Sequence, residues 1–201
     1  MTAGFELPDM VEARIWGVLA AENAERVLAS ASLLAADQRQ GHAIGLAVLA
    51  VEEAVKARAL FGYARYGGRF SLDDVTLARL LKGDHRLRHF VAWMQGSSPT
   101  AWRWLASEGE TDRTADAKVE AELVALDWLM IANESKNGGF YVDYKGAGHW
   151  STPQAATDEQ WSMANAVATP FVDEAMEQAT RNMEDLKTAG PHPLRPEGGS
   201  G

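Results

Sequence analysis

One short segment carries residue types that acid–base chemistry at a phosphodiester requires. Residues 79–89 read RLLKGDHRLRH in an otherwise acidic chain. Metal-free RNA cleavage needs a group that titrates near pH 7 and a fixed cation for the phosphate, and His85 and Arg79 supply them. Gly83 breaks the helical pattern, so both side chains are expected near a helix junction, where Asp84 is placed to cap a helix or orient the ring. The alternative is a solvated basic face, because an Arg and a His this close are common by chance.

The same segment offers little for a metal ion. His85 and His89 stand four residues apart, which places two imidazoles on one helical face. The spacing indicates no third ligand; the nearest further candidates are Asp84, Asp143 and His149. The chain also has no cysteine, which excludes disulfides, thiolate nucleophiles and cysteine-bound zinc or iron–sulfur sites. We therefore expect neither a metal nor a cofactor.

Two adjacent carboxylates interrupt the apolar helix predicted over residues 42–66. At about 100° per residue, Glu53 falls inside one apolar stripe, and Glu52 lies between stripes, one turn before Lys56. A carboxylate on a buried face needs a partner or a shifted pKa. We expect Glu53 to orient a cationic or histidine side chain at a site. The alternative is structural: Glu52 pairs with Lys56, and Glu53 caps a neighbouring group.

An aromatic segment follows the glycine pair Gly138-Gly139. It reads Phe-Tyr-Val-Asp-Tyr over residues 140–144 and is the one strand-like stretch of the chain. In a functional interpretation, Tyr141, Asp143 and Tyr144 lie beside the histidine segment. In a structural interpretation, the segment is a short hairpin or loop that plugs the end of a bundle, with Phe140 and Val142 inside.

The rest of the sequence is predicted to be mostly helical, since it is rich in Ala, Leu, Glu and Met and poor in alternating β-branched runs. The expected helices span residues 8–37, 42–66, 71–81, 84–94, 101–108, 114–136 and 157–187. The glycine pair after Asn137 is expected to end the sixth helix, and Pro170 to kink or split the last. Trp16, Trp128 and Trp161 are expected in the core. The prediction is an all-α bundle of four long helices, with short helices inserted after the second and an aromatic Tyr-Val-Asp-Tyr loop before the last.

Length and charge fit one globular domain. The 201 residues include 28 acidic and 19 basic side chains, which gives a formal net charge of −9. We expect a single domain over residues 1–188 and a disordered tail over residues 189–201, which holds three prolines and ends Gly-Gly-Ser-Gly. The acidic balance argues against nonspecific binding to nucleic acid. The longest apolar run stops at Glu52, and no basic region precedes a hydrophobic run at the N-terminus, so we expect a cytoplasmic protein without a membrane span.

Three segments together resemble the AbiV (abortive infection V) family. Residues 41–57 resemble its helix with a Glu-Glu-x-x-Lys signature, formed here by Glu52, Glu53 and Lys56. Residues 84–88 resemble its Asp-His-x-x-Lys segment, with Arg88 in place of lysine, and residues 139–144 resemble its Gly-Leu-Tyr-Val-Asp-Tyr segment. The similarity covers roughly residues 15–180.

The resemblance implies a HEPN-like helical bundle and a role in bacterial defence against phage. It further implies a homodimer that attacks RNA and shuts down translation in infected cells, with a phage-encoded protein as activator. HEPN ribonucleases use an Arg and a His separated by four to six residues, which Arg79 and His85 match. In that assignment His85 is the general acid–base, Arg79 steadies the phosphate, and Glu53, Asp84 and Tyr141 position them.

A non-catalytic module that binds a phage or host protein is the alternative function. The acidic composition favours it, since a ribonuclease usually needs a basic track. Convergence of four cations on one groove would favour RNA, and their dispersal would favour a protein partner; these are Lys82, Arg86, Arg88 and Lys145.

Overall fold

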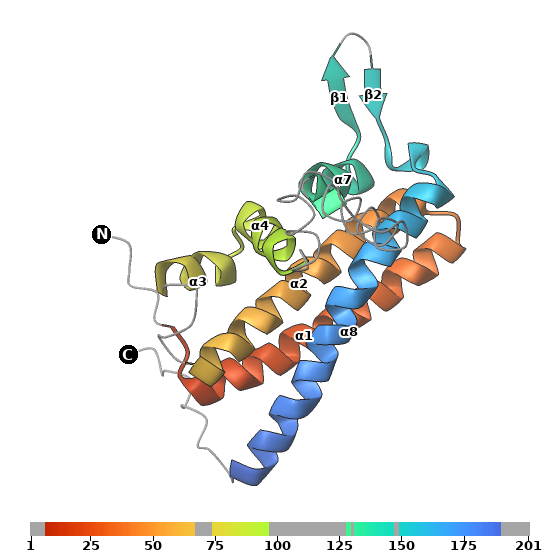
Figure 1. Ribbon diagram of the computed structural model, residues 1–201. Helices are drawn as coiled ribbons and strands as arrows, with labels where there is room; N and C mark the ends of the chain where they lie inside the picture. Colours follow the sequence, from red (N-terminus) through yellow and green to blue (C-terminus); the bar gives the residue numbers. More distant parts are fainter. Residues whose placement is uncertain (1–6, 67–73, 97–127, 130, 147–148, 190–201) are drawn as a thin grey trace, which may run out of the picture.

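The computed structural model describes residues 7–66, 74–96, 128–129, 131–146 and 149–189. Three long helices form the body of the molecule (Figure 1): α1 (Met10–Ala36), α2 (Gln40–Tyr66) and α8 (Asp158–Ala189). Shorter helices follow α2 in the chain: α3 (Asp74–Leu81), α4 (His85–Gly96) and α7 (Ala132–Phe140). The predicted all-α, HEPN-like bundle is confirmed. The expected helix over residues 101–108, the first part of the one over 114–136, and the tail lie outside the described residues.

Small side chains allow α1 and α2, of 27 residues each, to pack closely. Alanines fill their shared core at 0% exposure, and Gly17 of α1 faces the ring of Phe61, where an added Cβ would lie 2.5 Å from the ring. Asp9 and Glu12 cap the start of α1 reciprocally. Gln38, with φ of 60°, makes the turn into α2. Trp16 is an exception to the prediction, because 57% of its surface is exposed rather than buried in the core.

Helix α7 ends later than the sequence predicts. It runs through Gly138 and Gly139 to Phe140 instead of stopping at Lys136. The reason is packing against α2: a Cβ on Gly139 would lie 2.3 Å from the carbonyl oxygen of Gly41. Glycine here serves close helix contact rather than chain termination.

Helix α8 begins where the sequence predicts and is not interrupted at Pro170. Thr157 and Gln160 form the expected capping box, with N–H···O distances of 3.0 and 3.3 Å. The helix then continues from Asp158 to Ala189 with Pro170 inside it, so the expected split does not occur. None of the described helices is long and apolar enough to cross a membrane.

A small antiparallel hairpin connects α7 to α8. Strand β1 (Asp143–Gly146) pairs with β2 (His149–Ser151), and a 3₁₀ turn, η2 (Pro153–Ala155), leads into α8 (Figure 1). The strand therefore begins at Asp143, and Phe140 belongs to α7. Val142 is 61% exposed, which contradicts its predicted place inside the bundle.

Candidate functional site

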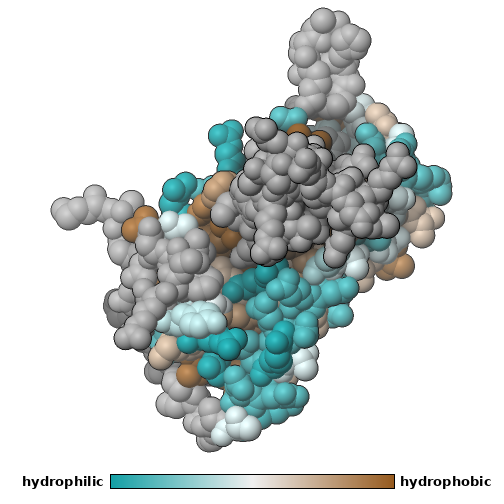
Figure 2. Space-filling view, in the orientation of Figure 1, coloured by the Kyte–Doolittle hydropathy of each residue, from teal (hydrophilic) through white to brown (hydrophobic). Residues whose placement is uncertain are grey.

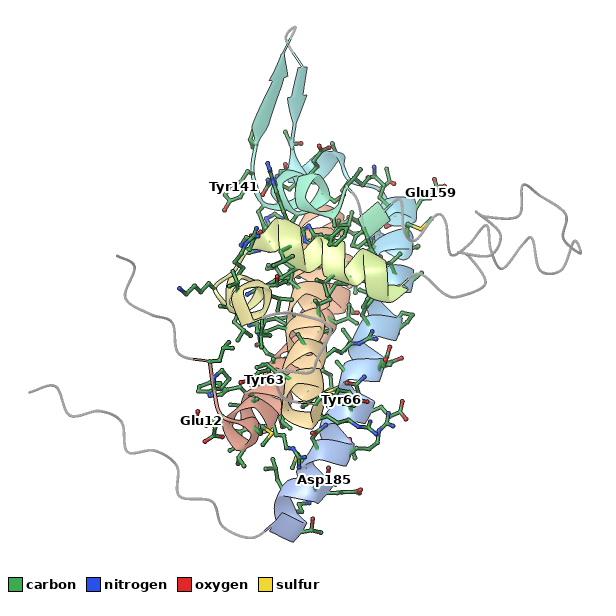
Figure 3. All side chains as sticks on the ribbon, turned by 60° about the vertical axis from the view of Figure 1, so that its left-hand side comes forward. Glu12, Tyr63, Tyr66, Tyr141, Glu159 and Asp185 are labelled. Carbon is green, nitrogen blue, oxygen red and sulfur yellow. The ribbon has the colours of Figure 1, made fainter. Side chains whose placement is uncertain are left out.

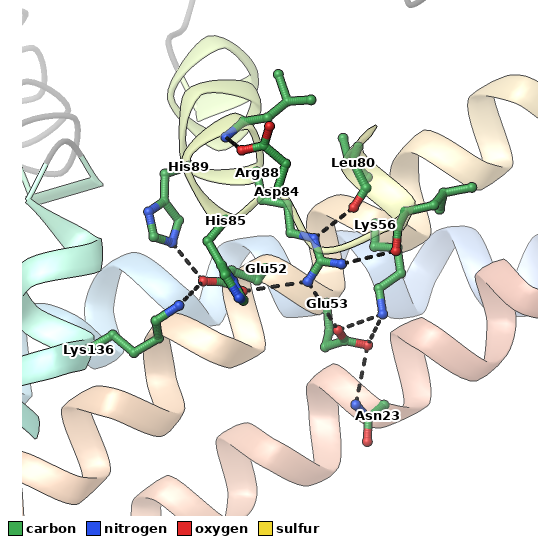
Figure 4. A network of polar contacts seen from close by, with 12 residues as sticks. Asn23, Glu52, Glu53, Lys56, Leu80, Asp84, His85, Arg88, His89 and Lys136 are labelled. Atoms are coloured by element: carbon green, nitrogen blue, oxygen red, sulfur yellow. Dashed lines mark hydrogen bonds and ion pairs between the residues drawn. The ribbon is translucent and has the colours of Figure 1, made fainter. Parts of the chain in front are cut away.

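The buried carboxylate of Glu52 is the centre of a polar network between α2, α4 and α7 (Figure 4). Its side chain is 1% exposed. One oxygen, Oε2, lies 2.5 Å from Nδ1 of His85, and the other, Oε1, lies 2.9 Å from Nε2 of His89 and 2.8 Å from Nζ of Lys136. Arg88 adds an ion pair at 3.5 Å. A single carboxylate thus holds four basic side chains from two helices.

The spacing on α4 explains how three of these partners reach the same group. His85, Arg88 and His89 stand at positions i, i+3 and i+4, which share one face of a helix. Asp84 starts that helix, since its Oδ1 accepts the backbone N–H of Leu87 at 3.1 Å. Gly83, with φ of 93°, makes the preceding turn in the left-handed region that glycine tolerates.

Arg88 ties the end of α3 to this face. Its Nε donates to the carbonyl oxygen of Leu80 at 2.9 Å, and its Nη2 to that of Leu81 at 3.4 Å. These are carbonyls of the last turn of α3, which lack partners within the helix. The guanidinium therefore fixes α3, α4 and Glu52 relative to one another.

The environment keeps Glu52 ionised. Burial raises its pKa and is the largest single influence, but the hydrogen bonds from His89, Lys136 and His85 together outweigh it and lower the pKa to about 2. Nζ of Lys136 lies 2.8 Å and Nη1 of Arg88 lies 3.5 Å from the carboxylate oxygens. At neutral pH the site therefore holds a fixed anion surrounded by donors.

His85 joins this anion to the surface. The ionised carboxylate only accepts hydrogen bonds, so Nδ1 of His85 carries a proton toward Glu52, and Nε2 is the nitrogen that can exchange a proton with a substrate. The His85 side chain is 48% exposed, whereas His89 is 7% exposed. Among the described residues no contact is made by Nε2, and a half-exposed imidazole oriented by a carboxylate is the arrangement that a general base needs.

Arg79 and Asp84 form a second pair next to His85. The guanidinium donates to Oδ2 of Asp84 from Nη2 at 2.7 Å and from Nε at 3.2 Å. The backbone N–H of Leu87 and then Arg79 lower the pKa of Asp84. Arg79 is 62% exposed. The predicted trio of Arg79, Asp84 and His85 thus lies at one helix junction, with Asp84 in contact with Arg79 and capping the helix rather than orienting the ring.

The family model described as AbiV, HEPN_AbiV, matches residues 12–169 of the chain. This range includes the whole Glu52 network and both helices of the Arg79–Asp84 junction. The chain belongs to the HEPN_AbiV family. Membership in this family suggests an abortive-infection defence protein of the HEPN type. No curated protein and no solved structure matches the chain.

The two adjacent glutamates of the AbiV-type Glu-Glu-x-x-Lys helix have the opposite contacts from those that we expected. Glu52, not Glu53, orients His85, because α4 packs on the Glu52 side of α2. Glu53 instead bonds Lys56 at 2.6 Å and Asn23 at 3.3 Å, with Arg88 at 3.8 Å. The alternative pairing of Glu52 with Lys56 is therefore also wrong. Glu53 and Lys56 line a cavity of about 640 Å³ beside Trp16.

Of the three remaining AbiV-type positions, only Tyr141 has a side chain that the structure describes. Tyr141 is 62% exposed and points outward at the base of the hairpin (Figure 3), with its ring edge-on to Phe140. Asp143 and Tyr144 belong to β1, and their side chains fall outside what the structure describes. Among the described contacts, none joins Tyr141 to His85, so its predicted positioning role receives no support from the geometry.

The four cations proposed as an RNA track do not converge as a set. Arg88 is buried on Glu52, so its charge is unavailable to a strand of RNA. Lys82 and Arg86 are exposed, and the side chain of Lys145 lies outside the described residues. Arg88 is therefore not available to the proposed track, which removes one of its four cations.

Sequence reasoning missed two members of the network. His89 was considered only as a metal ligand; the described residues contain no cluster of three or more metal-ligating side chains. Lys136 was expected only as the last residue of the helix over 114–136 and had no assigned role, although it contacts Glu52 across 84 residues of sequence. The i, i+4 spacing of His85 and His89 could have predicted that both contact one acceptor. No pattern in the sequence could have predicted the contact of Lys136 with Glu52.

Proposed function

We propose that this chain is an antiphage abortive-infection protein that cleaves RNA without a metal ion, with His85 as the general acid–base. The observation that carries the proposal is the 2.5 Å contact between the buried carboxylate of Glu52 and Nδ1 of half-exposed His85. In this proposal Glu52, rather than Glu53, is the residue that positions His85. Glu52 holds the tautomer and stabilises the imidazolium that forms during proton transfer.

The chemistry uses the ribose 2′-hydroxyl as the nucleophile. Nε2 of His85 takes the hydroxyl proton, and the 2′-oxygen forms a bond to phosphorus. The bond from phosphorus to the 5′-oxygen breaks, and that oxygen takes a proton from an imidazolium. The products are a 2′,3′-cyclic phosphate and a 5′-hydroxyl. Arg79, whose guanidinium is held by Asp84 and is largely exposed, contacts the non-bridging phosphate oxygens.

We further propose a cytoplasmic homodimer that a phage-encoded protein activates. A second copy would supply a second His85 as proton donor to the leaving 5′-oxygen while the first accepts from the 2′-hydroxyl. No cofactor enters this reaction, since the nucleophile belongs to the substrate.

Cleavage of RNA in EDTA by the purified chain, alone and with phage-infected extract, tests the assignment. We expect His85→Ala to reduce the rate by about 100-fold or more, because general acid–base catalysis contributes roughly 10²–10⁴. His42→Ala is the matched control, since this histidine lies against Phe140, outside the Glu52 network. Undiminished cleavage by His85→Ala would remove His85 from the mechanism.

A non-catalytic interaction module is the second candidate function. Exposed apolar side chains favour it: Tyr141 and Val142 lie between α7 and the hairpin, and Phe90 lies on α4. In this case a phage or host protein binds the exposed apolar residues, and His85→Ala leaves phage protection intact.

A further inference from the structure

The two oxygens of Glu52 contact different pairs of basic groups (Figure 4). Oε2 lies 2.5 Å from Nδ1 of His85 and 3.5 Å from Nη1 of Arg88. Oε1 lies 2.8 Å from Nζ of Lys136 and 2.9 Å from Nε2 of His89. The side chain of Lys136 is 10% exposed and comes from α7, whereas the other three partners come from α4. Lys136 and His85 thus contact opposite oxygens of one buried carboxylate.

Most other charged groups around His85 are already paired with one another. On α2, Glu53 lies 2.6 Å from Lys56. At the junction of α3 and α4, Asp84 lies 2.7 Å from Arg79. Each of these pairs is formally neutral. The further charge on this part of α4 is Arg86, which is exposed to water and therefore screened.

Charged side chains elsewhere on the described surface do not reach this site. Figure 2 shows hydrophilic residues gathered over the half of α8 that lies away from the hairpin. The ion pair between Arg181 and Glu177 is formed within that helix. Among the described contacts, none joins α8 to Glu52 or His85. The charge next to His85 is therefore set by the partners of Glu52.

Lys136 leaves an excess of positive charge at the carboxylate. One negative charge, that of Glu52, faces the two cations Arg88 and Lys136, so the formal charge is +1 while both imidazoles are neutral. The attraction between Lys136 and Glu52 is among the causes that lower the pKa of Glu52. A second proton on His85 would raise the formal charge to +2, but only to +1 if Lys136 were absent. Repulsion between such charges is strong where water is largely excluded.

We propose that Lys136 is a positioning residue for His85, because its ammonium group on the opposite oxygen of Glu52 favours loss of the proton from Nε2. The inference rests on the proposed ribonuclease function, in which Nε2 of His85 accepts the proton of the 2′-hydroxyl. Glu52 alone orients the ring, but a buried carboxylate also stabilises the imidazolium and so weakens the base. Lys136 offsets this second effect and leaves the orientation unchanged.

An NMR titration of the full-length protein without RNA tests this role. The probe is the ring C–H resonance of His85, which is assigned by its absence from His85→Ala. Lys136→Met should raise the pH at which this resonance is half-shifted by about one unit, the order expected for one charge several ångströms away in a poorly solvated site. Lys136→Gln keeps a hydrogen-bond donor without the charge and should have the same effect. Lys136→Arg keeps the charge and should restore the parent titration.

Lys56→Met is the matched control, since it removes the same charge from the neighbouring Glu53. Its effect on the His85 titration should be smaller. Two outcomes would overturn the role of Lys136: an unchanged His85 titration in both Lys136→Met and Lys136→Gln, or an equal shift in Lys56→Met. Circular dichroism across the pH range checks that each variant is folded.

RNA cleavage in EDTA separates this inference from the proposed function. In the Lys136→Met protein, the acid limb of the cleavage rate against pH should move upward together with the His85 titration. A parent chain that does not cleave RNA would reject the proposed function, while a shifted titration would still support the charge balance at Glu52. Cleavage that is lost in His85→Ala, with a titration that does not respond to Lys136, would keep the proposed function and reject the role of Lys136.

Discussion

Glu52 combines two properties that rarely occur together, near-complete burial and full ionisation. Its four basic neighbours compensate for lost hydration and lower its pKa to about 2. Removing one partner of such a buried network leaves the others without a counter-charge, which is usually far more costly than losing a surface pair. The stability and the acid–base role of the site therefore depend on the same side chain.

Glu52→Gln should destabilise the fold by about 3–5 kcal/mol at pH 7, because Lys136 and Arg88 remain charged and buried. The pKa of Glu52 is lower in the folded chain than its unfolded value of about 4.3, so its stabilising effect is present above that value and is lost as pH falls toward 2. The difference in urea midpoint between parent and variant should therefore shrink from about pH 5 downward.

Glu53→Gln is the control for removing a carboxylate one position along. Glu53 is 17% exposed against 1% for Glu52, and its partner Lys56 reaches solvent, so its loss should cost less. Equal destabilisation by both variants, or a difference that does not change with pH, would contradict the central place of Glu52.

The residue types of the site were predictable, but the choice between the two glutamates was not. Helical periodicity placed Glu53 on an apolar stripe, yet both stripes of α2 are covered, and the docking of α4 decides which carboxylate meets the histidines. That docking depends on Arg88 and the α3 carbonyls, which are tertiary contacts. Lys136 contacts Glu52 from α7, and no pattern in the sequence of α7 predicts that contact.

At the scale of elements, glycine sets how closely α7 approaches α2. Gly139 contacts the backbone of Gly41, and Gly45 lies against the ring of Phe140, with space for no further carbon at either point. This approach brings Lys136, one turn before Phe140, within reach of Glu52. The helix end was predicted wrongly because a glycine pair is a local stop signal, while its partner glycines lie almost 100 residues earlier.

Gly139→Ala and Gly138→Ala form a matched pair in this contact. A Cβ at Gly139 would meet the Gly41 carbonyl at 2.3 Å, so we expect a loss of about 1–3 kcal/mol from overpacking. Nothing lies within 4 Å of a Cβ at Gly138, so that change should be neutral or stabilise the helix by up to about 1 kcal/mol. Urea unfolding of both variants measures the difference, and equal effects would argue against close packing at Gly139.

The Glu52 network and the hairpin lie at different points along the length of the bundle. The network lies beside the middle of α2, and the exposed hairpin base with Tyr141 lies at one end. The overall fold was predictable, since helix periodicity and capping signals are local and the long helices end within a few residues of expectation. The Glu52 network was not, because its members come from α2, α4 and α7 and only the packing of these helices brings them together.

Phage challenge of cells separates the catalytic and binding functions. We expect His85→Ala to abolish protection and growth arrest. Tyr141→Ala should reduce protection by at least about tenfold without reducing RNA cleavage by the purified chain, because Tyr141 is exposed and outside the Glu52 network. Plaque counts and cleavage rates of the two variants are the measurements. Protection retained by His85→Ala and lost by Tyr141→Ala would favour the interaction module.

The alanine and glycine packing of α2 also has a consequence for how that helix is held along its own axis. Side chains of unequal size interdigitate and prevent one helix from sliding past another, and here glycines provide the space for two rings: Gly17 of α1 for Phe61 of α2, and Gly45 of α2 for Phe140 of α7. A shift of α2 by one turn would move both rings away from these glycines. It would also separate Glu52 from all four basic groups at once. The axial position of α2 is therefore set twice, by the shape of its apolar contacts and by the same carboxylate that contacts the half-exposed histidine.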